Sequence, residues 1–387
     1  MRAQIEIGGY MVKNIKVIII FGTRPEAIKM APLVKELDKI PQIQCIVCVT
    51  AQHREMLDQV LKFFSIVPKY DLNIMKVKQS LTGITCSVLT GLEEIFEKEQ
   101  PDMVLVHGDT TTTFAASLAA FYKKIPVGHV EAGLRTHNKF FPYPEEMNRK
   151  LTGALTDLHF APTTTSKENL LKEGVEDSAI FVTGNTVIDA MKYTIKEEYI
   201  FDNPVLNAID YKNKKVIMVT AHRRENWGSG IENICKALKM IVSESKDVEI
   251  LYLVHPNPIV KDMVHGMLGG VDRIHLLQPI DTSEMHNLMR KCYLIMTDSG
   301  GIQEEAPHLG KPVLVLRDVT ERVEAENAGT VKLVGTNIDK IVLNANKLLR
   351  DLGEYSHMSK SINPYGDGNA SARIVDALLN YFNEDKI

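Results

Sequence analysis

Several features that would place this chain in a specialised class of protein are scarce or missing. The sequence of 387 residues has five cysteines, an odd number spread along the chain, so no disulfide framework is expected. Cys45 and Cys48 form a lone C-x-x-C inside an apolar run, and no second pair completes a zinc site. We interpret these two residues as buried thiols.

Long apolar runs and an excess of one charge are also absent. No run approaches the roughly 18 to 20 residues of a membrane helix, and the segment from Met1 to Val12 lacks the apolar core of a secretory signal. A net charge of −4 and a pI near 6.3 give no electrostatic case for nucleic acid or an anionic membrane. We therefore expect a cytoplasmic protein with no nucleic-acid partner and no membrane partner.

The glycine fingerprint of dinucleotide-binding enzymes, G-x-G-x-x-G, is missing as well. The segment from Phe21 to Pro25 stands where this fingerprint would follow the first predicted strand, and it reads Phe-Gly-Thr-Arg-Pro. Redox chemistry with a dinucleotide is therefore disfavoured.

What is present is an alternation of short apolar runs with longer helical patterns. The runs are apolar almost throughout, which is typical of parallel strands covered on both faces. The predicted strands are 15–21, 43–50, 103–106, 126–130, 158–161, 179–182, 215–220, 248–254, 274–277, 293–296 and 312–316. Helical spacing marks 27–40, 111–123, 230–243, 285–292 and 370–382. The pattern predicts an α/β fold with two Rossmann-like, doubly wound domains.

The length of the chain favours two domains, and the sequence offers one clear break. It follows Val182-Thr-Gly-Asn-Thr186 and precedes a charged stretch, so we place the domain boundary there. The final helix, 370–382, could belong to either domain.

The segment 293–305 is the most informative stretch. A buried strand stops at a polar pair, and two glycines let the backbone turn into a helix predicted to start near Ile302. The free N–H groups of a helix start can hold a diphosphate, and carboxylates one turn further can accept from a sugar hydroxyl. The residues concerned are Asp298, Ser299, Gly300, Gly301, Glu304 and Glu305. This pattern predicts a nucleotide-sugar site, with an ordinary strand-to-helix turn as the alternative.

Ionisable residues follow strand after strand in both halves. Singly, each has an ordinary explanation as a helix cap or turn former. Together they predict two facing sheet ends and a polar cleft between the domains, since open parallel sheets bind ligands beyond the carboxyl ends of their strands. In the first half they are Arg24, Lys29, Gln52, His53, His107, Asp109, His129, Glu131 and Arg135, and in the second His222, Arg223, His255, Asp298 and Ser299.

Acidic residues are concentrated in the first half. Asp109 and Glu131 follow strands, and the pair Glu145-Glu146 follows a loop that two prolines stiffen. A pair of acids in a first helical turn can also simply complement the helix dipole. The second half offers His222 and the glycine helix, which suit phosphate. We therefore predict that one domain holds a nucleotide and the other performs acid–base chemistry.

These motifs together resemble those of the non-hydrolysing UDP-N-acetylglucosamine 2-epimerases, from about Lys16 to Tyr381. The matching segments are 21–32, 52–56, 107–110, 129–135, 144–146 with 148–149, 222–226 and 298–305. The resemblance implies a glycosyltransferase-B-like fold with the active site in the interdomain cleft. It assigns 14–186 plus 366–387 to the first domain, with a returning C-terminal helix, and 187–365 to a UDP-binding domain.

The resemblance also implies an activity. Members of the family interconvert UDP-GlcNAc and UDP-ManNAc by anti elimination of UDP to a 2-acetamidoglucal, followed by re-addition of UDP. No cofactor and no metal are needed, and the expected assembly is a homodimer. The alternatives are a hydrolysing 2-epimerase that releases ManNAc and UDP, a glycosyltransferase of the same architecture, and a non-catalytic UDP-sugar sensor.

Roles for individual residues follow from the same resemblance. The implied catalytic residues are Asp109, Glu131 and Glu145, with His222 stabilising the departing diphosphate. The residues assigned to UDP or substrate binding are Arg24, Lys29, Arg135, His222, Arg223, Ser299, Gly300, Gly301, Glu305 and Arg322. A second, activating UDP-GlcNAc site would involve Gln52, His53 and His255. Ala51 departs from the pattern, since the family usually has glycine there.

Overall fold

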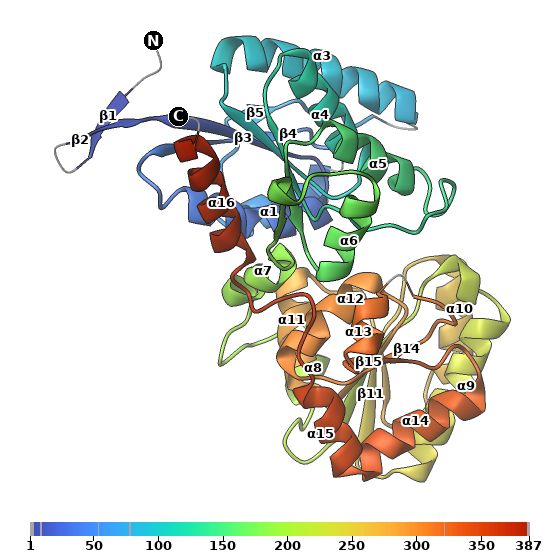
Figure 1. The fold of residues 1–387 in the computed structure, drawn as a ribbon. Helices are drawn as coiled ribbons and strands as arrows, with labels where there is room; N and C mark the ends of the chain where they lie inside the picture. The colour runs from blue at the N-terminus through green and yellow to red at the C-terminus, as the bar shows by residue number, and fades with distance from the viewer. Residues whose placement is uncertain (1–3, 8–9, 53, 77–78, 321, 385–387) are drawn as a thin grey trace. The chain divides into compact units, whose positions relative to one another are not determined.

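The computed structural model describes residues 4–7, 10–52, 54–76, 79–320 and 322–384. The chain divides into two compact units, which are Met1–Ala190 with Tyr365–Ile387, and Met191–Pro364 (Figure 1). The final helix, α16 (Ala370–Glu384), belongs to the first unit. The binding of UDP by the second domain stays a prediction.

The first unit is built on a seven-stranded sheet in the order β5-β4-β3-β6-β7-β8-β9, and all its strand pairs are parallel. Its strands are β3 (Ile15–Phe21), β4 (Ile43–Val49), β5 (Tyr70–Asp71), β6 (Met103–His107), β7 (Val127–Val130), β8 (Leu158–Ala161) and β9 (Ile180–Val182). The chain enters at β3, winds to one edge, and returns to β6 on the other side. The switch point therefore lies between β3 and β6, where doubly wound sheets bind ligands.

Helices cover both faces of this sheet. Helices α1, α2 and α16 pack with one face, and α3 and α4 pack with the other. The helices of this part are α1 (Arg24–Leu37), α2 (Arg54–Phe63), α3 (Leu81–Glu99), α4 (Thr111–Tyr122), α5 (Glu145–Leu155), α6 (Thr164–Lys172), α7 (Thr186–Thr194) and a 3₁₀ turn, η1 (Asp177–Ala179). Cys45 and Cys48 pack with opposite faces of the sheet, and burial raises the pKa of each thiol to about 12. They are free thiols.

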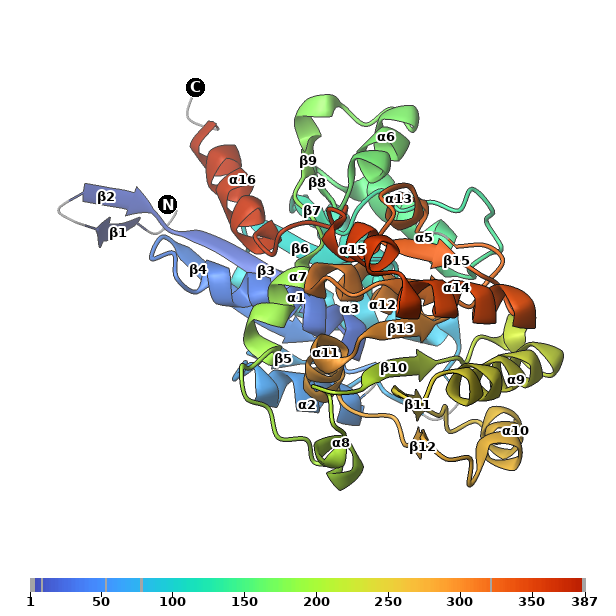
Figure 2. The same cartoon turned by 90° about the horizontal axis from the view of Figure 1, so that it is seen from below.

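The second unit repeats this plan with a six-stranded parallel sheet in the order β12-β11-β10-β13-β14-β15. Figure 2 shows β13, β10, β11 and β12 side by side in this order. The strands are β10 (Lys215–Thr220), β11 (Val248–Leu253), β12 (Ile274–Leu277), β13 (Leu294–Thr297), β14 (Val313–Val315) and β15 (Val331–Leu333). The switch point lies between β10 and β13.

Helices α9, α10 and α14 share one apolar core with this second sheet. The helices and 3₁₀ turns of the unit are α8 (Pro204–Ala208), η2 (Arg224–Asn226), α9 (Ser229–Glu244), α10 (Pro258–Leu268), α11 (Thr282–Lys291), α12 (Gly300–Glu305), η3 (Ala306–Leu309), α13 (Val323–Asn327), α14 (Ile338–Arg350) and α15 (Leu352–Lys360). The predicted fold class, two parallel α/β sheets with flanking helices, is confirmed.

Each predicted strand is present, and its ends differ from the prediction by at most one residue. The start of the glycine helix is predicted wrongly, because α12 begins at Gly300 and not near Ile302. Ser299 is its N-cap, with φ −81° and ψ 129°, so both glycines lie within the first helical turn. The antiparallel hairpin of β1 (Gln4–Ile7) and β2 (Tyr10–Lys13) is not predicted from sequence.

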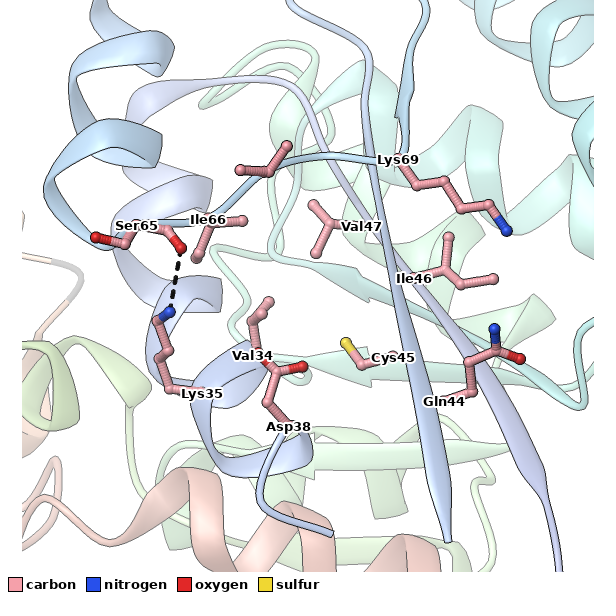
Figure 3. Close-up of a pocket in the computed structure, with 11 residues that line it drawn as sticks. Val34, Lys35, Asp38, Gln44, Cys45, Ile46, Val47, Ser65, Ile66 and Lys69 are labelled. Carbon is pink, nitrogen blue, oxygen red and sulfur yellow. Dashed lines mark hydrogen bonds between the residues drawn. The ribbon is translucent and has the colours of Figure 1, made fainter. Parts of the chain in front are cut away.

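In the described part of the chain, no helix combines the length and apolar character needed to cross a membrane. A small cavity of about 200 Å³ lies in the first unit, between the last turn of α1 and the first half of β4 (Figure 3). Lys35 closes one side of it by donating a hydrogen bond to the carbonyl oxygen of Ser65, at 3.3 Å. None of the predicted site residues that the structure describes lines this cavity.

Candidate active site

The switch point of the first unit is organised by a buried carboxylate, Glu26. Its side chain accepts hydrogen bonds from the backbone N–H of Thr23 at 2.8 Å and from the hydroxyl of Thr110 at 2.8 Å. Burial raises the pKa of Glu26, although these hydrogen bonds oppose the shift. Glu26 thereby ties the loop that carries Arg24 to the loop that carries Asp109. Our sequence interpretation missed this role, although T-x-x-E before a helix is a recognisable capping box.

Asp109 follows β6 and faces α5. One of its carboxylate oxygens lies 2.9 Å from Nε and 2.6 Å from Nη2 of Arg149. The side-chain amide of Asn148 also donates to the main-chain oxygen of Asp109, at 2.9 Å. These contacts hold an aspartate that is still 27% exposed, so it can reach a ligand.

Glu131 follows β7 and has the most constrained setting of the three predicted catalytic acids. Its φ of 65° lies in the left-handed region, which is strained for a residue with a side chain. Its Oε2 atom pairs with the ammonium of Lys29 and accepts a hydrogen bond from the side-chain amide of Asn185 at 2.8 Å. Lys29, which the resemblance assigns to substrate binding, thus lies against the carboxylate of Glu131.

Two histidines of the strands that precede these acids, His107 and His129, are buried. His107 is almost fully buried, and its Nε2 lies 3.8 Å from Oε2 of Glu131. Among the residues that the structure describes, neither ring nitrogen has a hydrogen-bond partner. Burial lowers the pKa of His107 to about 4, and the opposing effect of Glu131 is smaller. Burial also lowers the pKa of His129 to about 3; its Nε2 lies 2.7 Å from the main-chain oxygen of Gly108. Both imidazoles are therefore neutral at pH 7.

The two acids at the start of α5, Glu145 and Glu146, have different settings. Glu146 is fully buried and accepts hydrogen bonds from the backbone N–H groups of Thr136 and His137, each at 3.0 Å. It shapes the loop before the helix. Glu145 has a buried Oε2 atom that finds no hydrogen-bond partner in the described part of the chain. Since buried polar atoms are nearly always paired, this oxygen is a candidate contact for a bound ligand.

The other predicted residues of the first unit lie in varied settings. Arg24 is the half-buried first residue of α1. Arg135 forms a bidentate pair with Glu173, at 2.9 and 2.7 Å, and its side chain is fully enclosed. Gln52 accepts a hydrogen bond from Thr112 at 3.3 Å. His53 lies outside the described residues.

The switch point of the second unit is centred on Asp298, which is fully buried. Its Oδ2 atom accepts hydrogen bonds from the backbone N–H groups of His222 and Arg223, both at 2.8 Å, and from the side-chain amide of Asn226 at 2.9 Å. The loop after β10 is thereby tied to the end of β13. The sequence interpretation placed Asp298 at the strand end but gave it no role.

The imidazole of His222 lies beside the same carboxylate. Its Nδ1 is 3.2 Å from Oδ1 of Asp298, an oxygen with no hydrogen-bond partner among the described residues, so the two groups form an ion pair when the imidazole is protonated. The ring stacks on that of His255, with centroids 5.4 Å apart and planes 12° apart. Burial lowers the pKa of His222, Asp298 raises it, and Arg223 and His255 lower it further.

Ser299 begins the glycine helix, α12. Its hydroxyl makes no capping hydrogen bond, while its carbonyl oxygen accepts from the side-chain amide of Gln303 at 3.1 Å. Thr320 donates in turn to Oε1 of Gln303, at 2.7 Å. This buried amide therefore holds the start of the helix against the loop that precedes Arg322.

Two carboxylates follow within α12, and they have different partners. Glu304 is buried and accepts from Nε of Arg322 at 2.8 Å, so the predicted substrate contact Arg322 is engaged by this acid. Oε2 of Glu305 lies 3.4 Å from Nε2 of the buried His286. Oε1 of Glu305 lies 3.4 Å from the position of a β-carbon added at Gly301, so this glycine leaves the carboxylate room.

Each unit thus gathers predicted site residues at the carboxyl ends of its own strands. The predicted cleft between the domains and the second UDP-GlcNAc site stay predictions. No group of three or more His, Cys, Asp or Glu side chains within the described residues could hold a metal ion.

Comparison with known proteins decides the family. The model of the UDP-N-acetylglucosamine 2-epimerase family matches residues 35–379. The chain belongs to this family. A relative from Clostridium acetobutylicum is 70% identical over 370 residues, which covers 96% of each chain. The UDP-N-acetylglucosamine 2-epimerase of Bacillus subtilis is 57% identical over 370 residues, again 96% of each chain.

Solved structures of the epimerase family agree with the fold. A crystal structure of a UDP-N-acetylglucosamine 2-epimerase is 55% identical with a TM-score of 0.89, covering 97% of this chain and 98% of that one. The enzyme from Neisseria meningitidis, bound to UDP-GlcNAc, is 51% identical with a TM-score of 0.85, covering 95% of this chain and 100% of that one. The predicted family and its enzyme class, an isomerase, are confirmed.

Proposed function

We propose that this member of the epimerase family interconverts UDP-GlcNAc and UDP-ManNAc by reversible epimerisation at C2 of the sugar. The observation that carries the proposal is the division of chemistry between the units. Carboxylates lie at the strand ends of the first unit, and groups suited to a diphosphate lie at those of the second. The N. meningitidis relative with UDP-GlcNAc bound supports the choice of substrate.

The chemistry of the substrate explains why both sets of groups are needed. The proton at C2 has no adjacent carbonyl group to acidify it, so direct abstraction is unfavourable. Breaking the anomeric C1–O bond gives the ring oxocarbenium character, which acidifies this proton. Anti elimination of UDP then yields a 2-acetamidoglucal, and re-addition of UDP with proton return on the other face completes epimerisation. The reaction therefore requires stabilisation of the leaving diphosphate and carboxylates beside the ring.

In this mechanism the second unit holds the leaving group. Nε2 of His222 donates to a diphosphate oxygen, and the buried Asp298 stabilises the imidazolium that forms as negative charge develops on UDP. The backbone N–H groups of Gly300 and Gly301, with the hydroxyl of Ser299, supply further donors at the start of α12.

The first unit supplies the acid and base. Asp109 is held by Arg149, and Glu131 by Lys29 and Asn185, so each carboxylate has a defined orientation. Glu145 offers its unsatisfied Oε2 atom. Groups of this kind typically contribute about 10² to 10⁴ in rate each.

The proposal is tested by incubating the protein with UDP-GlcNAc in deuterated water and following C2 by NMR. The expected result is deuterium at C2 of both UDP-GlcNAc and UDP-ManNAc. Accumulation of free ManNAc would instead assign the hydrolysing reaction. Unchanged substrate, with no exchange at C2, would reject both. The homodimer stays a prediction.

A further inference from the structure

Asn185 is a buried residue with no predicted role that contacts the carboxylate of Glu131. It is 2% exposed and directly precedes α7. Its Nδ2 donates to Oε2 of Glu131 at 2.8 Å, and its Oδ1 accepts from the backbone N–H of Val187 at 3.1 Å. Its backbone N–H donates to the carbonyl oxygen of Tyr365 at 2.8 Å. The amide is therefore held in place at both ends.

The backbone around Asn185 is also held closely. Gly184 has a φ of 90°, and a β-carbon added there would lie 3.2 Å from the carbonyl oxygen of Tyr365. Arg373 of α16 donates to the carbonyl oxygen of Thr183 at 2.9 Å. The turn from Thr183 to Asn185 therefore has little freedom, and it presents the amide to Glu131 from a rigid support.

Two other side chains near Glu131, those of Lys29 and His107, are charged or titratable. Lys29 of α1 pairs with the same oxygen, and Nε2 of His107 in β6 lies 3.8 Å from it. A lysine ammonium is a point charge on a flexible stem, so it attracts the carboxylate without fixing its plane. A planar amide held at its other end supplies that missing constraint. Because it donates to the carboxylate, it also favours the ionised form.

We propose that Asn185 is a positioning residue for Glu131, fixing the orientation of this carboxylate and favouring its ionised state during turnover. The inference rests on the proposed epimerisation. It assigns Asn185 no contact with the substrate, since the residue acts through the Glu131 carboxylate.

The alternative is that Asn185 has a purely structural role as the N-cap of α7. Aspartate is as good an N-cap as asparagine, because one side-chain oxygen serves the same helix N–H. The two readings therefore separate at Asn185→Asp. This change keeps an oxygen for Val187 but places a second carboxylate about 2.8 Å from Glu131, as the present amide contact shows. Like charges at this distance raise the proton affinity of the pair.

The experiment compares Asn185→Asp and Asn185→Ala with the unchanged protein in the epimerisation assay across pH 5 to 9. We expect kcat to fall about tenfold in Asn185→Ala and by about 10² or more in Asn185→Asp, the range of a misplaced acid–base group. In both variants, the part of the pH–rate profile that reports the ionisation of Glu131 should shift to higher pH. Binding of UDP-glucose should change less than about twofold, because the diphosphate is assigned to the other unit.

A matched control is Asn337→Asp. Asn337 is an exposed N-cap of α14 whose Oδ1 accepts from the backbone N–H of Lys340 at 3.0 Å. The same chemical change there should leave kcat and the pH profile unaltered. Thermal unfolding of all variants separates loss of activity from loss of fold. If Asn185→Asp does not fold, the pH profile of Asn185→Ala decides.

The outcomes are distinct. Full activity and an unshifted profile in Asn185→Asp would overturn the positioning role while leaving the epimerase proposal intact. Absence of turnover by the unchanged protein would reject the proposed function itself, and the inference with it. An Asp variant less active than the Ala variant, with both profiles shifted, supports the inference.

Discussion

Oδ1 of Asp298 lies 3.2 Å from Nδ1 of His222, and the two residues follow the two central strands, β13 and β10, of one sheet. The carboxylate is fully buried, whereas the imidazole is 38% exposed. A buried carboxylate beside Nδ1 of a partly exposed imidazole favours the protonated ring. The protonation state of His222 therefore also depends on whether a charged ligand is bound at the exposed side of the ring.

The first prediction concerns proton uptake on ligand binding. Burial lowers the pKa of His222 in the free protein, and a bound diphosphate should raise it. Binding therefore takes up a proton, and affinity should rise as the pH falls from the higher pKa of the complex toward the lower pKa of the free protein. UDP-glucose is a suitable probe because each of its phosphates carries one ester and one anhydride linkage and so has no group that titrates near pH 7.

Calorimetry in buffers of different ionisation enthalpy measures this uptake directly. We expect a gain in affinity of at most about tenfold per pH unit, the limit for one proton. His222→Asn should remove the pH dependence. An affinity for UDP-glucose that is constant from pH 6 to 8 in the unchanged protein would contradict the role given to His222.

The second prediction concerns the stability contributed by Asp298. Asp298→Ala removes an acceptor of three hydrogen bonds in the core of the second unit. Because hydrogen bonds to charged groups contribute about 1.5 to 3 kcal/mol each and are not additive, we expect a loss of about 3 kcal/mol in the free energy of unfolding. Urea denaturation measures it.

Asp281→Ala is the matched control for that measurement. Asp281 is an ordinary N-cap of α11 and accepts from the backbone N–H of Glu284 at 2.8 Å. Its loss should cost about 1 kcal/mol. Equal losses of unfolding free energy in the two variants would show that Asp298 contributes no more to stability than an ordinary helix cap.

The third prediction separates the two acids at the start of α5. Glu145→Gln should lower kcat by at least about 10² with little change in stability, because Glu145 is proposed to act on the substrate. Glu146→Gln should lower the unfolding free energy by about 1 to 3 kcal/mol, because Glu146 accepts from two backbone N–H groups and from Arg149. Near-full activity of Glu145→Gln would remove that residue from the mechanism.

Asp109→Asn and Glu131→Gln extend this test to the strand ends of the first unit. Each should also lower kcat by at least about 10². The expected cause is loss of a proton-transfer group, so UDP-glucose binding should be retained in both variants. A variant that loses binding and turnover together would have a role in holding the nucleotide.

The fourth prediction follows from the buried imidazole of His107. Its pKa is about 4 in the folded protein and about 6.5 when unfolded, so the unfolded state binds more protons between these values. Stability is therefore lost as the pH falls from 6.5 to 4. His107→Gln should remove about 1.4 kcal/mol per pH unit from the slope of unfolding free energy against pH in this window. Urea titrations at pH 7, 6 and 5 measure the slope. A slope that is the same in His107→Gln and in the unchanged protein would contradict this prediction.

Much of the fold was predictable because apolar runs in parallel sheets are nearly continuous. Strands β5 and β15 were missed because neither is a continuous apolar run: Tyr70–Asp71 includes an aspartate, and Val331–Leu333 has a lysine at its centre. The backbone conformation of Ala51 explains the family pattern from which it departs. Its φ is 53°, a left-handed conformation in which glycine carries no penalty, and this accounts for the usual glycine there.

The site was predictable only in part, because its supporting contacts join residues that are distant in sequence. The positions of Asp109, Glu131 and His222 follow from their places after strands. The contact of Asn185 with Glu131 does not, since the sequence around Asn185 reads as a turn at a domain boundary. The pairing of Lys29 with Glu131 likewise depends on the packing of α1 against β3, β4 and β6, which lie far from it or from Glu131 in the sequence.

The return of α16 to the first unit has a consequence for how the protein is made. Ile374 and Leu378 of α16 are fully buried in the same core as Val17 and Met30. During synthesis on the ribosome, this core therefore stays incomplete until the codons for α16 have been translated and the helix has left the exit tunnel. The second unit, whose residues end at Pro364, has its whole sequence available earlier.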